Sequence, residues 1–201
     1  DRIAIAMRNY PEWMMAYCAI VSLGAIAVPL NSWGKADDLI YGLSDSGARV
    51  VFCDQQRYEP IADFAEQADL QCVLTRQDDS LDLSPAHLNS WQALVTAGEG
   101  QSVPWFDCDS EDPVMIMYTS GTTGNPKGAL SCHRAIIQAI YCFEFQGTAS
   151  AMANEAAIVK MMESGFEAAS LLAVPLFHVS GLHACFLLSL RGGRKIVMMY
   201  K

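Results

Sequence analysis

The hydrophobic positions along the chain fall into two alternating kinds of segment. Short apolar runs predict buried strands at Arg2–Met7, Ile26–Leu30, Val50–Cys53, Cys72–Thr75, Pro113–Thr119, Ser170–Pro175 and Lys195–Tyr200. Apolar residues three or four positions apart predict helices at Pro11–Leu23, Lys35–Ser46, Pro60–Ala68, Leu88–Ala97, Arg134–Phe145, Ala149–Glu163 and Leu182–Leu190. Strands that alternate with helices predict an α/β fold, with a mostly parallel sheet flanked by helices.

One segment is long and apolar enough to raise the question of a membrane span. Residues 13–30 carry no charge, which meets the length that a spanning helix needs. Gly24 and Pro29 interrupt the segment, and Asn9-Tyr10-Pro11-Glu12 is typical of a helix start. The segment is therefore predicted to be a buried helix followed by a buried strand, with no transmembrane segment.

Composition and charge narrow the classes of protein that the chain can represent. With 201 residues, 52% hydrophobic and 17% charged, the chain is predicted to fold around a sizeable core. A net charge of −9 argues against a general nucleic-acid binder, which needs a basic surface. The acidic excess lies between Asp54 and Asp112 and is typical of a solvated face.

The seven cysteines are scattered and form no C-x-x-C pair. This pattern indicates reduced thiols of a cytoplasmic protein and favours neither a disulfide framework nor a zinc site. The sequence begins without a methionine, directly on a strand-like run. We therefore expect it to be a piece of a longer protein.

The stretch YTSGTTGNPKG, Tyr118–Gly128, follows the predicted strand Pro113–Thr119. In open parallel sheets, ligands bind beyond the carboxyl ends of the strands. Three glycines can let the backbone adopt positive φ and approach a ligand, hydroxyl groups supply donors and a lysine supplies a charge; these are Gly121, Gly124, Gly128, Thr119, Ser120, Thr122, Thr123 and Lys127. The combination suits a triphosphate, although composition alone also allows a turn-rich hairpin without a ligand.

The P-loop of nucleotide triphosphatases is one alternative for this stretch. Counted from Gly121, the second glycine of G-x-x-x-x-G-K-[ST] falls on Pro126, and Gly128 replaces the final Ser or Thr. No helix is predicted to start directly after Lys127, although a P-loop requires one. The P-loop is therefore excluded.

YTSGTTGNPKG resembles the phosphate-binding signature of the adenylate-forming superfamily, which includes acyl-CoA synthetases, luciferases and peptide-synthetase adenylation domains. Its pattern, Tyr/Phe-Ser/Thr-Ser-Gly-Ser/Thr-Thr-Gly-x-Pro-Lys-Gly, is matched at every specified position. Gly24–Trp33 and Pro175–Gly181 (PLFHVSG) are similar to two further family segments, and His133 matches a histidine common after the loop, although Cys132 stands where Ser is usual. The resemblance covers essentially the whole chain and implies part of the large N-terminal domain.

The resemblance implies that ATP activates a carboxylic acid as an acyl-adenylate, and that coenzyme A then accepts the acyl group. Phosphate contacts would come from Thr119, Ser120, Gly121, Thr122, Thr123, Gly124 and Lys127, with Mg²⁺ sharing the charge and no residue of this chain predicted as a metal ligand. Lys127 and His178 are the predicted catalytic residues, and Phe177 and His178 the predicted substrate contacts.

His178 also bears on the class of substrate. Amino-acid-activating relatives typically show Phe-Asp-x-Ser where this chain has Phe177-His178-Val179-Ser180. Histidine cannot attract an ammonium group as a carboxylate does, so a plain carboxylic acid, and in particular a fatty acid, is favoured. An amino-acid or luciferase-like adenylating enzyme and a non-catalytic phosphate-binding module remain alternatives.

The resemblance also implies that the adenine, ribose and C-terminal lysine motifs lie beyond residue 201, so the chain alone is predicted to be inactive. Its expected parts are a first α/β subdomain at 1–146, a helical insertion at 147–170 and the start of a second subdomain at 171–201. Of the other histidines, His183 is predicted to lie in the core and His87 to face solvent.

Overall fold

A computed structural model describes residues 1–119 and 124–199 of the chain. Contacts within the chain divide it into two compact units, Asp1–Cys132 and His133–Lys201. The three-part division expected from the sequence stays a prediction. No helix in the described part of the chain is long and apolar enough to cross a membrane.

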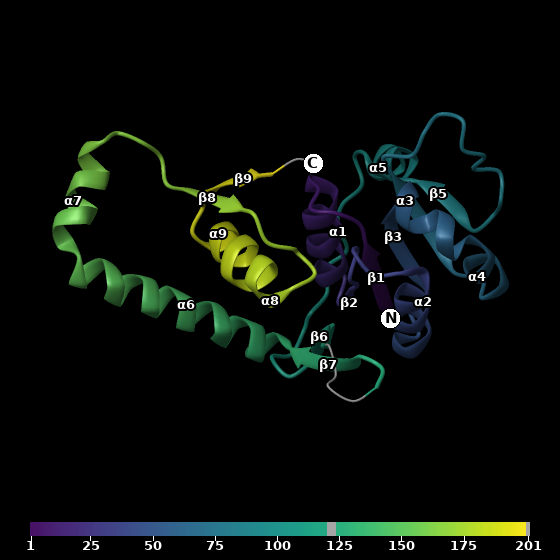
Figure 1. Ribbon diagram of the computed structural model, residues 1–201, viewed down its shortest axis with the longest axis horizontal. Helices are drawn as coiled ribbons and strands as arrows, with labels where there is room; N and C mark the ends of the chain where they lie inside the picture. The colour runs from purple at the N-terminus through teal and green to yellow at the C-terminus, as the bar shows by residue number, and fades with distance from the viewer. Residues whose placement is uncertain (120–123, 200–201) are drawn as a thin grey trace. The chain divides into compact units, whose positions relative to one another are not determined.

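The first unit is built on a sheet of seven strands in the order β5-β4-β3-β1-β2-β6-β7 (Figure 1). The strands are β1 (Arg2–Ala6), β2 (Ile26–Pro29), β3 (Val50–Asp54), β4 (Gln71–Thr75), β5 (Leu88–Ser90), β6 (Pro113–Thr119) and β7 (Lys127–Cys132). All neighbouring strands pair in parallel except β6 and β7, which are antiparallel. The mostly parallel α/β fold expected from the sequence is thereby confirmed.

The connections of the first unit are α1 (Pro11–Ser22), α2 (Ala36–Ser46), α3 (Gln55–Tyr58), the 3₁₀ helix η1 (Glu59–Ile61), α4 (Ala62–Gln67) and α5 (Trp91–Gly98). Local signals explain where several of these helices begin and end. Pro11 occupies the first position of α1, where its missing N–H costs nothing. Gly47, at φ 60°, ends α2 in a left-handed cap.

The main core lies between α2, α4 and one face of the sheet. Alternate residues of the central strands point into this core, because successive side chains of a strand face opposite sides; the buried strand residues include Ala4, Ala6, Val28, Val51, Cys53, Cys72 and Leu74. Leu39 and Leu43 of α2 close the core from the helix side. This packing holds α2 against the central strands, and Ile116 and Tyr118 of β6 pack partly buried against the same core.

The second unit contains α6 (His133–Ala153), α7 (Glu155–Glu163), β8 (Ala169–Leu172), α8 (Val179–Gly181), the π-helical segment η2 (Leu182–Leu187), α9 (Leu188–Arg191) and β9 (Lys195–Met198). The strands β8 and β9 form a parallel pair. Arg191 ties α9 to α6, since its Nε donates to Glu144 Oε1 at 2.7 Å and its guanidinium lies 4.7 Å from the Tyr141 ring centroid.

Several predicted elements differ from those observed. The predicted helix Leu88–Ala97 is instead β5 followed by α5, because Ser90 pairs in the sheet and its hydroxyl then caps α5 by accepting from Ala93 N at 3.0 Å. The strand β7 is missing from the prediction, since its sequence shows little hydrophobic alternation. The break predicted between the helices Arg134–Phe145 and Ala149–Glu163 lies later than expected, because α6 runs through Gly147 to Ala153 and α7 begins at Glu155.

Candidate functional site

The predicted phosphate loop leaves the carboxyl end of β6 and returns as β7. Thr119, the last residue of β6, pairs with Lys127, the first of β7, and its Oγ1 donates to Lys127 O at 3.4 Å. Both are exposed, and Lys127 forms no ion pair among residues 1–119 and 124–199. The ammonium group is therefore available to an anion beside the loop.

The structure tests part of the predicted glycine roles. Gly124 has φ +111°, a conformation that favours glycine, as expected from the motif. Gly128 lies in β7 without positive φ, so that part of the prediction is wrong: a Cβ there would lie 2.8 Å from Ile116 Cγ2, and glycine is needed for space. Four predicted phosphate contacts, Ser120, Gly121, Thr122 and Thr123, lie outside the described residues.

His178 and Phe177 lie in a compact turn of the second unit. The His178 N–H donates to Pro175 O at 3.2 Å, and Gly181 fits this turn because a Cβ would lie 2.1 Å from the same oxygen. His178 is exposed and caps α8, with Nδ1 accepting from Ser180 N at 3.3 Å. Since Nδ1 accepts, a neutral ring carries its proton on Nε2. Phe177 is half-buried.

The predicted burial of two other histidines, His183 and His87, is confirmed for the first and wrong for the second. His183, predicted in the core, is buried, and its Nε2 has no hydrogen-bond partner in the described part of the chain. Burial lowers the pKa of His183, which keeps its ring neutral at neutral pH. His87, predicted to face solvent, is buried instead, with Nε2 3.5 Å from Tyr58 Oη.

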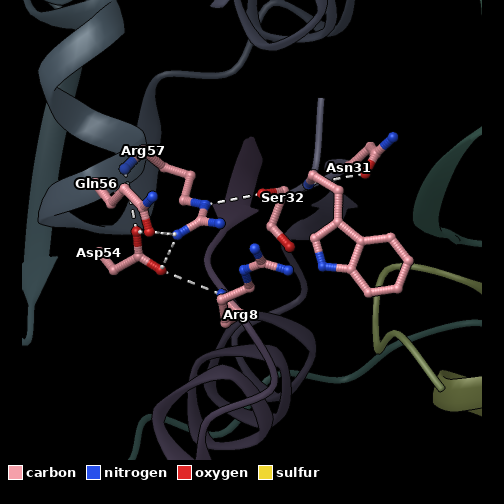
Figure 2. Close-up of polar contacts among 7 residues, drawn as sticks. Arg8, Asn31, Ser32, Asp54, Gln56 and Arg57 are labelled. Atoms are coloured by element: carbon pink, nitrogen blue, oxygen red, sulfur yellow. Dashed lines mark hydrogen bonds and ion pairs between the residues drawn. The ribbon is translucent and has the colours of Figure 1, made fainter. Parts of the chain in front are cut away.

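Sequence reasoning missed a second polar site in the first unit (Figure 2). The carboxylate of Asp54 accepts from Arg57 N at 3.1 Å, from Arg57 Nη1 at 3.3 Å and from Arg8 N at 3.2 Å. Arg57 Nε donates to Ser32 O at 2.8 Å. These contacts join the ends of β1, β2 and β3, which are neighbours in the sheet.

A cavity of about 260 Å³ opens beside these contacts. Its lining residues are Arg8, Ser32, Trp33, Gly34, Leu39, Gln56, Arg57 and Pro60. Asp54 neutralises Arg57, whereas Arg8 has no carboxylate partner within the described ranges and lies 5.6 Å from the Trp33 ring centroid. One uncompensated guanidinium beside an exposed indole suits an anionic or planar group. The sequence could have indicated this site only by the position of Arg8, Ser32 and Arg57, which follow three successive buried strands.

A metal centre is not formed by the described residues. They contain no group of three histidine, cysteine, aspartate or glutamate side chains that could hold an ion. All seven cysteines are free, with Cys53 and Cys72 buried.

Comparison with known proteins decides the family of the chain. The sequence profile described as AMP-binding enzyme matches residues 1–201. The chain belongs to this family.

Two curated relatives and one solved structure illustrate the similarity. The chain is 29% identical to long-chain-fatty-acid–CoA ligase FadD13 of Mycobacterium tuberculosis, over 98% of this chain and 35% of that protein. It is 27% identical to 4-coumarate–CoA ligase 2 of Oryza sativa subsp. japonica, over 99% of this chain and 34% of that protein. The inhibitor-bound N-terminal domain of FACL13 from M. tuberculosis superposes with a TM-score of 0.67 and 27% identity, over 99% of this chain and 44% of that chain. The chain thus spans about a third of the length of these curated relatives.

Proposed function

We propose that the protein carrying this chain activates a carboxylic acid with ATP and transfers the acyl group to coenzyme A. The observation that carries the proposal is the position of the signature, which leaves the carboxyl end of β6 and returns at an exposed Lys127 that forms no ion pair with the described residues. Membership of the AMP-binding enzyme family supports the nucleotide, and both relatives named above are CoA ligases.

The proposed first step is attack by the carboxylate of the acid on the α-phosphorus of ATP, which releases pyrophosphate. Negative charge grows on the departing phosphates and has to be neutralised in place. Lys127 supplies a positive charge at the loop, together with the hydroxyl and backbone donors of Thr119–Gly124. Mg²⁺ would share this charge when bound, and the described residues supply no cluster of ligands for it.

We further propose that the substrate is a plain carboxylic acid, and in particular a fatty acid. His178 stands where amino-acid-activating relatives carry an aspartate, and its Nε2–H is free to donate because Nδ1 already accepts from Ser180. A neutral imidazole N–H can hydrogen-bond a carboxylate or a thioester oxygen, but it attracts no ammonium group. Half-buried Phe177 would pack against the acyl chain. A cytoplasmic location, suggested by the free cysteines, completes the proposal.

A substrate panel on the full-length protein tests the proposal. Fatty acids of several lengths, 4-coumarate and amino acids would each be supplied with ATP, Mg²⁺ and coenzyme A, and AMP and acyl-CoA would be measured. We expect a CoA thioester from fatty acids. If 4-coumarate alone gave a thioester, a fatty acid would be ruled out as the substrate. Adenylation of amino acids would favour the amino-acid-activating alternative. ATP binding without any product would favour a non-catalytic module.

The role of Lys127 is tested by Lys127→Ala in the same protein. Loss of one charge from a transition-state site lowers kcat by about 100-fold. Lys160→Ala is the matched control, because Lys160 is also an exposed lysine, on α7. Unchanged turnover in Lys127→Ala would mean that the loop is not the phosphate site. The 201-residue chain alone is expected to show no ATP–pyrophosphate exchange with any fatty acid.

A further inference from the structure

Tyr118 connects the end of β6 to a helix that the family signature does not include. Its hydroxyl donates to Asp45 Oδ2 at 2.6 Å and lies 3.3 Å from Gly42 O. Both partners belong to α2. The signature accepts tyrosine or phenylalanine at this position, so the hydroxyl contact is a feature of this chain and not of the signature.

The ring of Tyr118 is also held from the side of β7. Tyr118 faces Gly128 across the β6–β7 pair, and a Cβ on Gly128 would lie 3.4 Å from Tyr118 Cζ. The edge of the Tyr41 ring meets Tyr118 at a centroid distance of 6.2 Å and an interplanar angle of 76°. Glycine in β7 and tyrosine in α2 thus enclose the ring while its hydroxyl reaches Asp45.

This arrangement lies next to the point where the loop begins and ends. Thr119 follows Tyr118, pairs with Lys127 and donates to its carbonyl oxygen. A contact that fixes Tyr118 therefore also fixes the backbone of Lys127 through one rung of the sheet. The helix α2, which carries Asp45, is itself held in place because its residues Leu39 and Leu43 pack into the core.

The direction of the hydrogen bond is stable over the ordinary pH range. Burial, and then the hydrogen bond to Asp45, raise the pKa of Tyr118 well above its usual value. The hydroxyl consequently stays protonated and donates to the carboxylate. A donor paired with a charged acceptor makes a stronger bond than a neutral pair.

We propose that the Tyr118–Asp45 hydrogen bond is a positioning contact, which holds the stem of the phosphate loop against α2 and so places Lys127 for the phosphates of ATP. The proposal rests on the proposed function for its ligand, and it adds two positioning residues, one of which lies outside the signature. Neither side chain needs to touch ATP. The contact acts through the backbone of β6 and β7.

Variants of the full-length protein test this contact by the dissociation constant of Mg·ATP and by thermal unfolding. Tyr118→Phe and Asp45→Ala each remove the hydrogen bond, and each is expected to weaken ATP binding about fivefold. The double variant is expected to bind no more weakly than either single variant, because both remove one interaction. Asp45→Asn keeps a neutral acceptor oxygen and should weaken ATP binding less than Asp45→Ala.

Tyr41→Phe is the matched control, since it deletes a hydroxyl on the same helix that makes no hydrogen bond with the described residues. It should leave ATP binding unchanged. Lower unfolding temperatures of Tyr118→Phe and Asp45→Ala with unchanged ATP affinity would overturn the proposal, because they would show a structural role alone. Additive losses in the double variant would overturn it as well.

The same measurements separate this proposal from the proposed function. A wild-type protein that binds no ATP would refute both the proposed function and the positioning contact. A wild-type protein that binds ATP but adenylates no acid would end the proposed function, whereas coupled losses of ATP affinity in the variants would still support the positioning contact.

Discussion

Removal of the Asp54 carboxylate should destabilise the first unit more than any surface substitution. The side chains of Arg57 and Asp54 are only 7% and 5% exposed, and their charged atoms lie 3.3 Å apart. Deleting one partner of a buried pair leaves the other charge uncompensated, which costs about 3–5 kcal/mol. Asp54 also caps α3 through Arg57 N, and the loss of such a cap costs about 1 kcal/mol.

These two costs overlap, because the same carboxylate makes both contacts. We therefore expect Asp54→Ala to lower the free energy of unfolding by about 4 kcal/mol. Urea unfolding of the chain, followed by circular dichroism, measures this loss. Glu12→Ala is the control: it breaks the ion pair between Arg76 Nη2 and Glu12 Oε2 at 3.1 Å, which is far less buried, and should cost at most about 1 kcal/mol.

A second substitution separates the buried charge from the lost packing. In the Asp54→Ala background, Arg57→Met removes the uncompensated guanidinium while keeping most of the side-chain volume. The double variant should therefore be more stable than Asp54→Ala alone. The reasoning would be refuted by a loss of about 1 kcal/mol or less in Asp54→Ala, which is the range of exposed pairs. A double variant no more stable than Asp54→Ala would refute it equally.

Further predictions follow from the glycines and from one buried histidine. Gly128→Ala should lower stability by about 1–3 kcal/mol, because its Cβ would meet Ile116 at 2.8 Å; an unchanged urea midpoint would contradict this. Gly124→Ala meets no atom of the described residues within 4 Å, so it should cost about 1 kcal/mol from its positive φ, measured in the same way. The lowered pKa of His183 means that the unfolded chain binds the proton more readily, so stability should fall as pH drops through the ordinary histidine range near 6.5. His183→Gln should flatten this pH dependence of the urea midpoint, and an unaltered dependence would exclude His183 as its source.

The sequence predicts β1, β2, β3, β4 and β6 well, because these strands are largely buried and read as continuous apolar runs. The short parallel strand β5 at one edge is missed, since its three residues show no such run. The strand β7 escapes prediction for a similar reason. It lies at the edge of the sheet, and four of its six residues are exposed, so no hydrophobic pattern marks it. Its presence follows from pairing with β6, which is a tertiary contact.

Of the candidate site too, one part could be predicted from the sequence and another part could not. The predicted phosphate loop is recognised by resemblance because the family signature is a contiguous stretch of sequence. Arg57 and Asp54 are not found, since charged residues are ordinarily assigned to the surface and nothing local reveals that Ser32 O will accept from Arg57. His87 is misassigned for a related reason: a polar neighbourhood in sequence says little about the Tyr58 side chain that covers it.

The order of the strands explains why the loop and the Arg8 cavity belong to the same edge of the sheet. After β5, at one side, the chain returns across the sheet to place β6 beside β2, with Ala27 opposite Met115. Because β1, β2, β3 and β6 all run parallel, their carboxyl ends meet at one edge. Arg8, Ser32 and Arg57 follow the first three strands, and the predicted phosphate loop follows β6. Lys127 and Arg8, neither paired with a carboxylate in the described part of the chain, therefore bring positive charge to the same edge of a chain whose net charge is −9. Positive charge at this edge attracts anions locally, even though the net charge of the chain as a whole repels them.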